Sequence, residues 1–490
     1  MFEDGLYYRD SRMATEAEYV QELAPFCIND AQCVSKGGPV LFRRQNMVFT
    51  DPSESHTLLV GDTGSMKTLR FVLPLIYSSA KAGESMILVD PKGELTRKTS
   101  GFLQRLGYKT PIINLRRPQD SPARWNPMGR IKKSYAGGVE GEKTAILQLN
   151  DLLNDLFFTR STADKDIYWN ETAGQFALGL CELILSTGED LSVKTLLNWR
   201  YGKLQAGILR AYFDALPTES DIYQNLAGYM SLTAENTKSC ILSTFDQLVR
   251  VFKASPALTD MLSETDFDMD EIGVQKTAVF LVVPDEKTTF HFLATLFINQ
   301  CYEALLDMAE AYHGTLPVRV NFILEEFCNM PKLSDLISML TAARSRNIRF
   351  HLIIQSYGQL VEKYGENISK TILDNCGDFI YLHSREISFL NYISQLAGRN
   401  EYGRPLISTS RLQRLKKNEA LIFHDRCCPF LAQDIPLIFE YPVQLGTELP
   451  VTKRTHIEEP ADDLFRKSGN RPRGKPRGRV SETSFRMVPP

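Results

Sequence analysis

The sequence predicts an α/β fold with a mostly parallel β-sheet covered by helices. Short runs rich in Val, Ile, Leu and Phe are apolar on both faces and alternate with segments of helical spacing. The runs are residues 56–60, 85–90, 110–115, 277–283, 319–326, 349–354, 378–382 and 419–424. With 43% hydrophobic and 23% charged residues, the composition is that of a globular protein with large cores, which excludes a disordered chain.

The predicted sheet is interrupted by a long helical stretch. Between residues 131 and 270 the β-type runs vanish and helical spacing takes over, for instance in 166–185 and 235–252. We therefore expect an all-α domain at 131–270, inserted into a sheet domain built from 41–130 and 271–445. Residues 1–40 form an N-terminal segment in this scheme.

The end of the chain has a different composition. Within residues 460–490, seven basic residues are interleaved with Gly and Pro between positions 466 and 479, so we expect a disordered basic tail. Such a tail can touch phosphate backbones or an anionic membrane, or it can be a solvated terminus. The formal net charge of −3 for the whole chain points to neither partner.

No membrane anchor or structural zinc site is predicted. The longest apolar stretch, 176–185, is about half of the ~20 residues that span a bilayer, and the first residues lack a signal-peptide pattern. The nine cysteines include no Cys-x-x-Cys pair. We expect a cytoplasmic protein with reduced cysteines.

A glycine-rich loop follows the first predicted strand and precedes a helical segment, which is the context of a phosphate-binding loop. Backbone N–H groups and the positive end of the helix would hold the β-phosphate. Lys67 would reach the β- and γ-phosphates, and Thr68 would offer its hydroxyl to Mg²⁺. The candidate nucleotide-binding residues are Gly61, Asp62, Thr63, Gly64, Ser65, Met66, Lys67 and Thr68.

One position departs from the strict loop pattern. Glycine is expected where Met66 stands, because a side chain there crowds the phosphate or requires a disfavoured backbone dihedral. Two other interpretations therefore stay open. The segment can be a chance glycine-rich turn, or a loop that binds nucleotide weakly or not at all.

Polar residues follow two later strands. Glu325 and Glu326 end the run 319–326, so one carboxylate can hold Mg²⁺ while the other polarises the attacking water. The alternative is that the two acids cap the next segment. Gln355 ends the run 349–354, as expected for a sensor of the γ-phosphate.

Arginines precede that second strand. Arg344, Arg346 and Arg349 lie in one short segment, and one of them could reach a neighbouring subunit's nucleotide as an arginine finger. Surface arginines after a helix are ordinary, so this assignment is a hypothesis.

The order of motifs resembles the VirD4/TraG coupling ATPases of type IV secretion and conjugation. The motifs are GDTGSMKT, ILVDPKGEL, RWNP, YWNETA, FILEEF, LIIQS and TILDNCGDFIYL, and the resemblance covers roughly residues 58–439. It implies a RecA-like P-loop NTPase domain with an inserted all-α domain credited with substrate recognition. It also implies a homo-hexamer that uses ATP and Mg²⁺ to deliver relaxase-bound single-stranded DNA to a secretion channel.

The resemblance assigns roles to the matching residues. Lys67 and Thr68 belong to the nucleotide loop, Glu325 replaces the usual Walker B Asp as the metal residue, and Glu326 is the catalytic glutamate. Gln355 matches the sensor and Arg344 the finger. Asp90, Lys92 and Glu94 match a signature whose chemical role we cannot derive, and a turn followed by a helix cap explains them nearly as well.

Three departures from the family pattern leave alternatives open. Met66 and Glu325 put the rate of hydrolysis in doubt. We also expect no counterpart of the family's amino-terminal membrane anchor, for which a shortened gene, a soluble paralogue or an anchor on a partner protein all fit. With an anchor on a partner, the resemblance implies a cytoplasmic protein that is peripheral at the inner face of the plasma membrane. One rival function is a DNA-pumping ATPase of the FtsK/HerA kind. The other is a non-hydrolysing adaptor that recruits relaxase and uses nucleotide only as a structural ligand.

Overall fold

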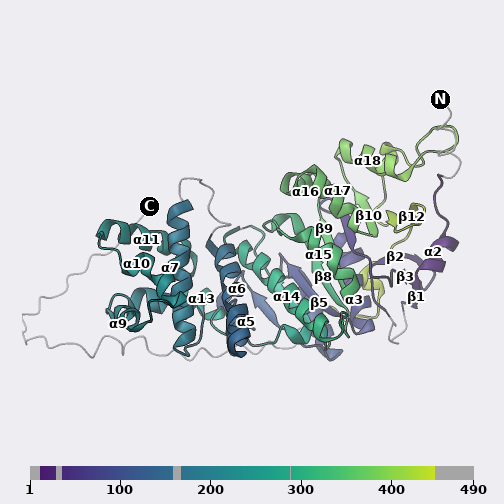
Figure 1. The fold of residues 1–490 in the computed structure, drawn as a ribbon. Coiled ribbons are helices and arrows are strands. Elements are labelled where there is room, and N and C mark those ends of the chain that lie inside the picture. The colour runs from purple at the N-terminus through teal and green to yellow at the C-terminus, as the bar shows by residue number, and fades with distance from the viewer. Residues whose placement is uncertain (1–10, 29–35, 158–166, 287, 447–490) are drawn as a thin grey trace, which may run out of the picture. The chain divides into compact units, whose positions relative to one another are not determined.

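Figure 1 shows the computed structural model, which describes residues 11–28, 36–157, 167–286 and 288–446. These described residues form one compact unit. The predicted basic tail at 460–490 lies outside the described residues, and its disorder stays a prediction.

All the predicted strands are present in one nine-stranded sheet. In spatial order it runs β12-β11-β10-β4-β9-β8-β5-β7-β6. The seven strands from β10 to β6 are parallel, and β11 and β12 are antiparallel additions at one edge. The strands are β4 (Thr57–Gly61), β5 (Ser85–Asp90), β6 (Ile112–Asn114), β7 (Ala278–Val282), β8 (Val320–Leu324), β9 (Ile348–Ile354), β10 (Asp378–His383), β11 (Ala420–His424) and β12 (Phe430–Ala432).

Helices cover both faces of this sheet (Figure 1), which explains why its strands are apolar throughout. Within β4, Leu58 and Val60 belong to one hydrophobic core and Leu59 to the other, as the two-residue period of a strand requires. The helices around the sheet are α3 (Leu73–Ala82), α4 (Glu94–Arg105), α14 (His291–Ala311), α15 (Leu336–Ala343), α16 (Tyr357–Tyr364), α17 (Glu366–Asn375), α18 (Ile387–Ala397) and α19 (Thr409–Leu412).

A small second sheet, not predicted from the sequence, precedes the phosphate-binding loop. It has the order β1-β3-β2, with β1 at Ala24–Cys27, β2 at Val40–Arg44 and β3 at Met47–Thr50. The helix α2 (Glu16–Glu22) leads into it. Its strands have only four or five residues, too few for a clear alternating pattern. It packs into the same core as α3.

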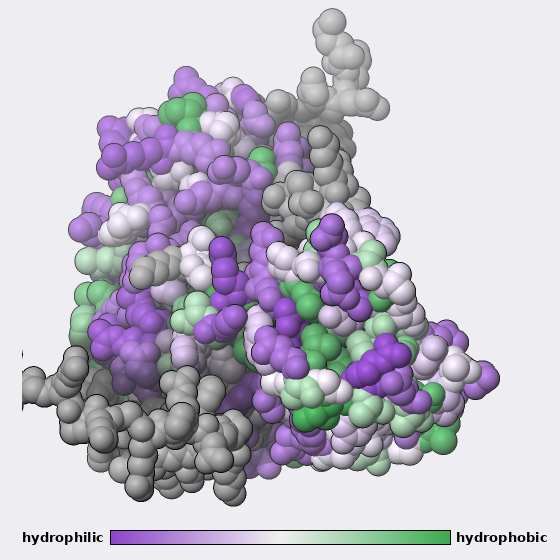
Figure 2. Space-filling model, turned by 90° about the vertical axis from the view of Figure 1, so that its left-hand side faces the viewer, coloured by the Kyte–Doolittle hydropathy of each residue, from purple (hydrophilic) through white to green (hydrophobic). Residues whose placement is uncertain are grey.

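In the described part of the chain, only helices lie between β6 and β7, as predicted. Helices α10 and α11 contact α7. Figure 2 shows a mostly hydrophilic surface on this side, with hydrophobic residues exposed between hydrophilic ones. The helices are α5 (Gly129–Tyr135), α6 (Gly138–Phe157), α7 (Ile167–Ser186), α8 (Val193–Asn198), α9 (Ile208–Ala215), α10 (Asp221–Met230), α11 (Glu235–Leu248), α12 (Arg250–Lys253) and α13 (Pro256–Met261).

The bounds of an inserted domain stay a prediction, because this helical block belongs to the same compact unit as the sheet. Within the described ranges, no helix is both long enough and apolar enough to cross a bilayer.

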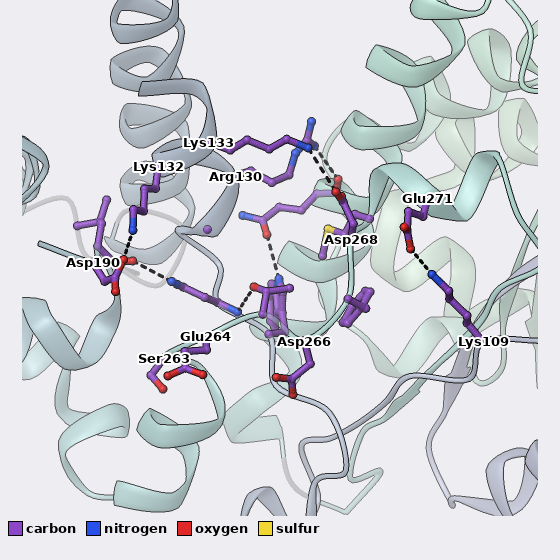
Figure 3. Close-up of a pocket in the computed structure, with 18 residues that line it drawn as sticks. Lys109, Arg130, Lys132, Lys133, Asp190, Ser263, Glu264, Asp266, Asp268 and Glu271 are labelled. Carbon is purple, nitrogen blue, oxygen red and sulfur yellow. Dashed lines mark hydrogen bonds and ion pairs between the residues drawn. The ribbon is translucent and has the colours of Figure 1, made fainter. Parts of the chain in front are cut away.

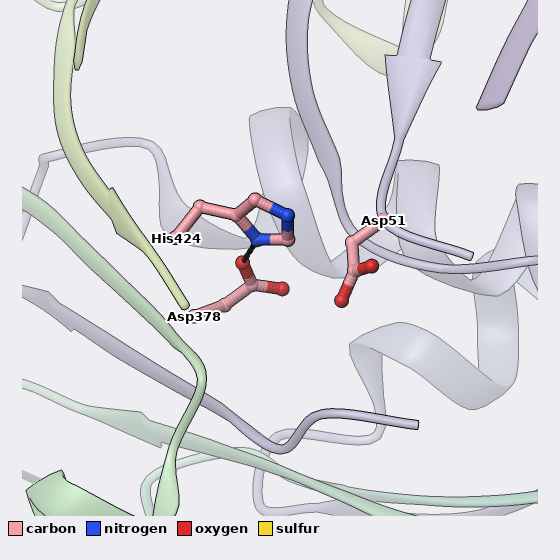
Figure 4. Close-up of side chains that lie close together, drawn as sticks. All are labelled: Asp51, Asp378 and His424. Carbon is pink, nitrogen blue, oxygen red and sulfur yellow. Dashed lines mark hydrogen bonds and ion pairs between the residues drawn. The ribbon is translucent and has the colours of Figure 1, made fainter. Parts of the chain in front are cut away.

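A buried acid cluster joins three segments of the fold (Figure 4). Asp51 follows β3, Asp378 begins β10 and His424 ends β11, and their polar atoms lie within 4.8 Å of one another. Nδ1 of His424 lies 2.7 Å from Oδ1 of Asp378, whereas Oδ2 of Asp378 has no hydrogen-bond partner. Burial, reinforced by the charge of Asp51, raises the pKa of Asp378 to about 7. Burial lowers the pKa of His424, but its hydrogen bond to Asp378 and the charges of Asp378 and Asp51 together outweigh this and raise the pKa to about 9.

These shifts predict that the free energy of unfolding falls as pH rises from about 4 to about 9. The folded state holds the Asp378 proton up to about pH 7 and the His424 proton up to about pH 9, whereas the unfolded chain loses both earlier. Asp378→Asn places an amide where the protonated acid stands, so it should flatten the decline between pH 4 and 7. Asp374→Asn, at an exposed carboxylate in α17, is the control. Urea unfolding across this pH range measures both, and an unchanged slope in Asp378→Asn would contradict the assignment.

Candidate nucleotide-binding site

The predicted site residues gather where three adjacent parallel strands end. Strand β9 lies between β4 and β8 in the sheet, and all three run in the same direction. The glycine-rich loop follows β4, Gln355 follows β9, and Glu325 and Glu326 follow β8. Because parallel strands end at one edge of a sheet, residues separated by about 260 positions in the sequence meet there.

The glycine-rich loop contains two residues with positive φ, and one of them is the methionine. Gly64 has φ +87° and Met66 has φ +66°, both in the left-handed region. Met66 thus adopts the conformation that favours the glycine of the strict pattern. The backbone N–H of Ser65 donates to the Asp62 carbonyl at 3.2 Å and closes the turn.

Lys67 lies inside the loop. Its Nζ donates to the carbonyl oxygens of Gly61 and, at 3.2 Å, of Asp62. Burial lowers the pKa of Lys67, while the charges of Glu326 and Glu325 oppose the shift. The ammonium group is therefore held in the loop interior, facing two carboxylates.

Each of the two glutamates of the site accepts a hydrogen bond from another predicted site residue. Oγ1 of Thr68 donates to Oε1 of Glu325 at 2.5 Å, and Nε2 of Gln355 donates to Oε2 of Glu326 at 2.8 Å. Thr63 donates to Oε1 of Gln355 at 3.4 Å, so the sensor position touches both the loop and the second acid. Both glutamates are buried. Burial raises the pKa of Glu325 to about 7, and the hydrogen bond from Thr68 opposes the shift.

Glu326 has an unusual backbone. Its φ of +54° lies in the left-handed region, a backbone conformation that residues other than glycine rarely adopt. The turn after β8 therefore directs two consecutive acids to different partners, Thr68 and Gln355. This separation is what the predicted division of roles between metal ligand and base requires. Neither acid's carboxylate caps the short helical turn at Phe327–Asn329 through a side-chain hydrogen bond.

The structure does not bring Arg344 to this site within one chain. Arg344 precedes β9, whereas Gln355 follows it, and a strand of seven residues is about 23 Å long. Arg344 is exposed, but Arg349 is fully buried and donates to Asn321 and to backbone carbonyls. Burial thus removes Arg349 from the finger candidates. Arg344 stays a candidate for a site in another subunit.

The DPKGEL signature has a structural explanation. The carboxylate of Asp90 accepts hydrogen bonds from the N–H groups of Glu94 and Thr96, at 2.9 and 2.8 Å, and from the Thr96 hydroxyl. It caps the start of α4, as one of the two sequence interpretations proposed. His383, which sequence reasoning missed, lies beside the loop with Nδ1 2.8 Å from Oδ2 of Asp62.

Met66→Gly is expected to raise the free energy of unfolding by ~1 kcal/mol, because glycine adopts a positive φ without the clash of a Cβ atom. ATP turnover should change little, since the loop already has the required turn. Met66→Ala retains the Cβ atom and should not stabilise the protein. Urea unfolding and nucleotide titration measure the two effects. A roughly tenfold gain in nucleotide affinity for Met66→Gly would show instead that the methionine crowds the phosphate, a penalty of ~1.4 kcal/mol.

A cavity of about 800 Å³ is lined mainly by residues from the beginning and the end of the helical block (Figure 3). Its three lysines pair with acidic residues that also line it. Lys109 lies 2.6 Å from Glu271, and Lys132 pairs with Asp190. Asn126 of the RWNP motif lines the cavity and donates a hydrogen bond to the Leu191 carbonyl. This motif therefore connects the start of the helical block to the loop before α8. None of the predicted site residues lines this cavity.

The family model "Type IV secretory system Conjugative DNA transfer" matches residues 11–420. The chain belongs to this conjugative DNA transfer family. The resemblance inferred from the motifs is thereby confirmed, and the coupling family is favoured over the FtsK/HerA alternative.

Two relatives of this chain with names from conjugative transfer are distant in sequence. Conjugal transfer protein TraG of Escherichia coli is 24% identical over 377 residues, covering 72% of this chain and 56% of TraG. Protein VirD4 of Rhizobium radiobacter is 24% identical over 396 residues, covering 77% of this chain and 52% of VirD4. The chain thus spans only a little over half the length of these relatives.

Solved structures support the fold. Plasmid coupling protein TrwB in complex with the ATP analogue ADPNP has a TM-score of 0.63 at 16% identity, over 91% of this chain and 96% of that one. TrwB in complex with ADP and Mg²⁺ gives the same TM-score and identity. At this identity the likeness shows the mixed α/β fold of the coupling protein and not its chemistry.

Proposed function

We propose that this chain is an ATP-dependent coupling protein that binds Mg²⁺-ATP at residues 61–68 and hydrolyses it to deliver DNA to a type IV secretion channel. The observation that carries the proposal is the meeting of Lys67, Thr68, Glu325, Glu326 and Gln355 at three adjacent strand ends. Family membership supplies the DNA-transfer setting.

Two oxygen atoms in the site suit a magnesium ion. Thr68 Oγ1 and Glu325 Oε1 lie 2.5 Å apart, and hydroxyl and carboxylate oxygens are ligands that Mg²⁺ accepts. Thr68 and Glu325 would hold the ion, which neutralises charge on the phosphate oxygens. Burial raises the pKa of Glu325 without a cation, and a bound cation would lower it by favouring the ionised form.

The remaining residues act on the triphosphate and on water. Lys67 exchanges the carbonyl oxygens of Gly61 and Asp62 for β- and γ-phosphate oxygens as its hydrogen-bond acceptors. Glu326 accepts a proton from the attacking water while Gln355 orients its carboxylate. Since Gln355 also contacts Thr63 of the loop, it relays a change at the γ-phosphate to β9.

The position of Arg344 supports a site completed between subunits. It lies at the sheet edge opposite its own chain's loop, so it acts only on a neighbour's nucleotide. A homo-hexamer would provide that neighbour. The relaxase–DNA substrate, the channel components and peripheral attachment to the inner membrane face through a partner belong to the same proposal.

Steady-state ATP hydrolysis with and without single-stranded DNA tests the proposal. We expect magnesium-dependent turnover that DNA stimulates. Tight nucleotide binding without any turnover would instead support a non-hydrolysing adaptor, the interpretation that Met66 had left open.

A further inference from the structure

A strongly basic segment lies on the surface after α18. Residues 399–417 contain six basic residues and one acidic residue, a local net charge of +5 in a chain whose total is −3. Among the described residues, the sole ion pair formed by these six basic side chains joins Arg411 to Glu419. The other five are exposed, and they are Arg399, Arg404, Arg414, Lys416 and Lys417.

The first part of this segment is a small, ordered hairpin. Arg399 and Pro405 form an antiparallel bridge, and the side chain of Asn400 accepts hydrogen bonds from the backbone of Tyr402 and Arg404 at 3.0 Å. At its tip, Tyr402 is 78% exposed. An aromatic ring so exposed on a fixed turn is available to stack on a partner at little cost in conformational entropy.

The exposed cations and the exposed aromatic ring of this segment are suited to binding single-stranded nucleic acid. Unpaired cations can neutralise phosphates and release counterions, and an exposed aromatic ring stacks on an unpaired base whatever its sequence. A duplex hides the faces of its bases. Its phosphates can therefore bind the cations, but its bases cannot stack on Tyr402.

The side chain of His383 connects this segment to the glycine-rich loop. His383 ends β10, with Nδ1 2.8 Å from Asp62 of the loop and Nε2 3.2 Å from the Gln413 carbonyl of the segment. Tyr381 of the same strand donates to the Leu412 carbonyl at 3.3 Å. Gln413 of the segment is therefore connected to Asp62 of the loop through the side chain of His383.

We propose that residues 399–417 bind single-stranded nucleic acid, with Tyr402 stacking on a base and Arg404, Lys416 and Lys417 contacting phosphates. The inference rests on the proposed function for its DNA substrate. It adds the surface that holds the strand and places that surface beside the nucleotide site.

Fluorescence anisotropy of a labelled oligonucleotide across a salt series tests the phosphate contacts. The full chain carrying Arg404→Gln, Lys416→Gln and Lys417→Gln should show a slope of log affinity against log salt that is shallower by about 2, at about 0.7 per lost contact. The control carries Lys143→Gln, Lys194→Gln and Lys370→Gln, which remove the same charge from exposed lysines that form ion pairs. Its slope should equal that of the parent. Equal slopes in the two triple variants would overturn the proposal.

Tyr402→Ala tests stacking separately. It should weaken binding of the single strand about tenfold with an unchanged salt slope, leave binding of duplex DNA unaltered, and be rescued by Tyr402→Phe. No loss in Tyr402→Ala would overturn the stacking contact.

Nucleotide titration of the same variants separates this inference from the proposed function. Normal binding of single-stranded DNA and of nucleotide in every variant would overturn the assigned surface but would not contradict the proposed ATPase function. A parent chain that binds nucleotide but no single strand would overturn both the surface and the DNA-coupling role.

Discussion

Lys67→Ala is expected to abolish measurable ATP binding or to lower turnover by at least ~10², the cost of losing one preorganised donor to developing charge. The ammonium group already lies in the loop interior, where it faces Glu325 and Glu326 and donates to loop carbonyls. Backbone N–H groups alone cannot neutralise the charge of a triphosphate. Isothermal titration with an ATP analogue and a steady-state assay measure the two effects.

The control for this substitution is Lys81→Ala, at the end of α3, the helix that follows the loop. It removes the same charge outside the loop and should leave turnover unchanged. Because Lys67 is buried, thermal unfolding of Lys67→Ala must also show that the variant is folded. Parental turnover in a folded Lys67→Ala protein would refute the assignment of the phosphate-binding loop.

Glu326→Gln should lower turnover by ~10² or more while nucleotide affinity stays within a fewfold of the parent, because a positioned general base is lost and no phosphate contact is removed. The glutamine is isosteric and can still accept the hydrogen bond from Gln355, so the site geometry should persist. Single-turnover kinetics at saturating ATP isolate the chemical step from binding.

The neighbouring acid provides the matched comparison. Glu325→Gln should chiefly raise the Mg²⁺ concentration needed for activity, since Glu325 pairs with Thr68 in the predicted metal position. A larger loss of the chemical step in Glu325→Gln, with binding intact, would reverse the roles of the two acids.

Much of the sheet was predictable because its strands are buried on both faces. A fully buried parallel strand needs an uninterrupted apolar run, and each such run in the sequence is a strand in the structure. The strands β1, β2, β3 and β12 were missed. Each includes partly exposed positions, so none of them is the run apolar on both faces that marks a fully buried strand.

The candidate site was predictable in its residues but not in its contacts. The loop pattern and the acids after β8 indicate chemistry, whereas the order of strands that places β9 between β4 and β8 is a property of the whole chain. The φ of +66° at Met66 could be expected from the glycine it replaces. No local pattern pointed to His383, which reaches Asp62 only because β10 pairs with β4.

The structure of the Glu326→Gln variant bound to Mg²⁺ and ATP tests the central claim most directly, since this variant should hold the nucleotide without hydrolysing it. We predict that Nζ of Lys67 leaves the carbonyl oxygens of Gly61 and Asp62 and lies within hydrogen-bond distance of the β- and γ-phosphates. Oγ1 of Thr68 should bind the metal ion, with the carboxylate of Glu325 beside it. Nucleotide bound elsewhere, or a Lys67 that still bonds to the loop carbonyls with ATP present, would contradict the account.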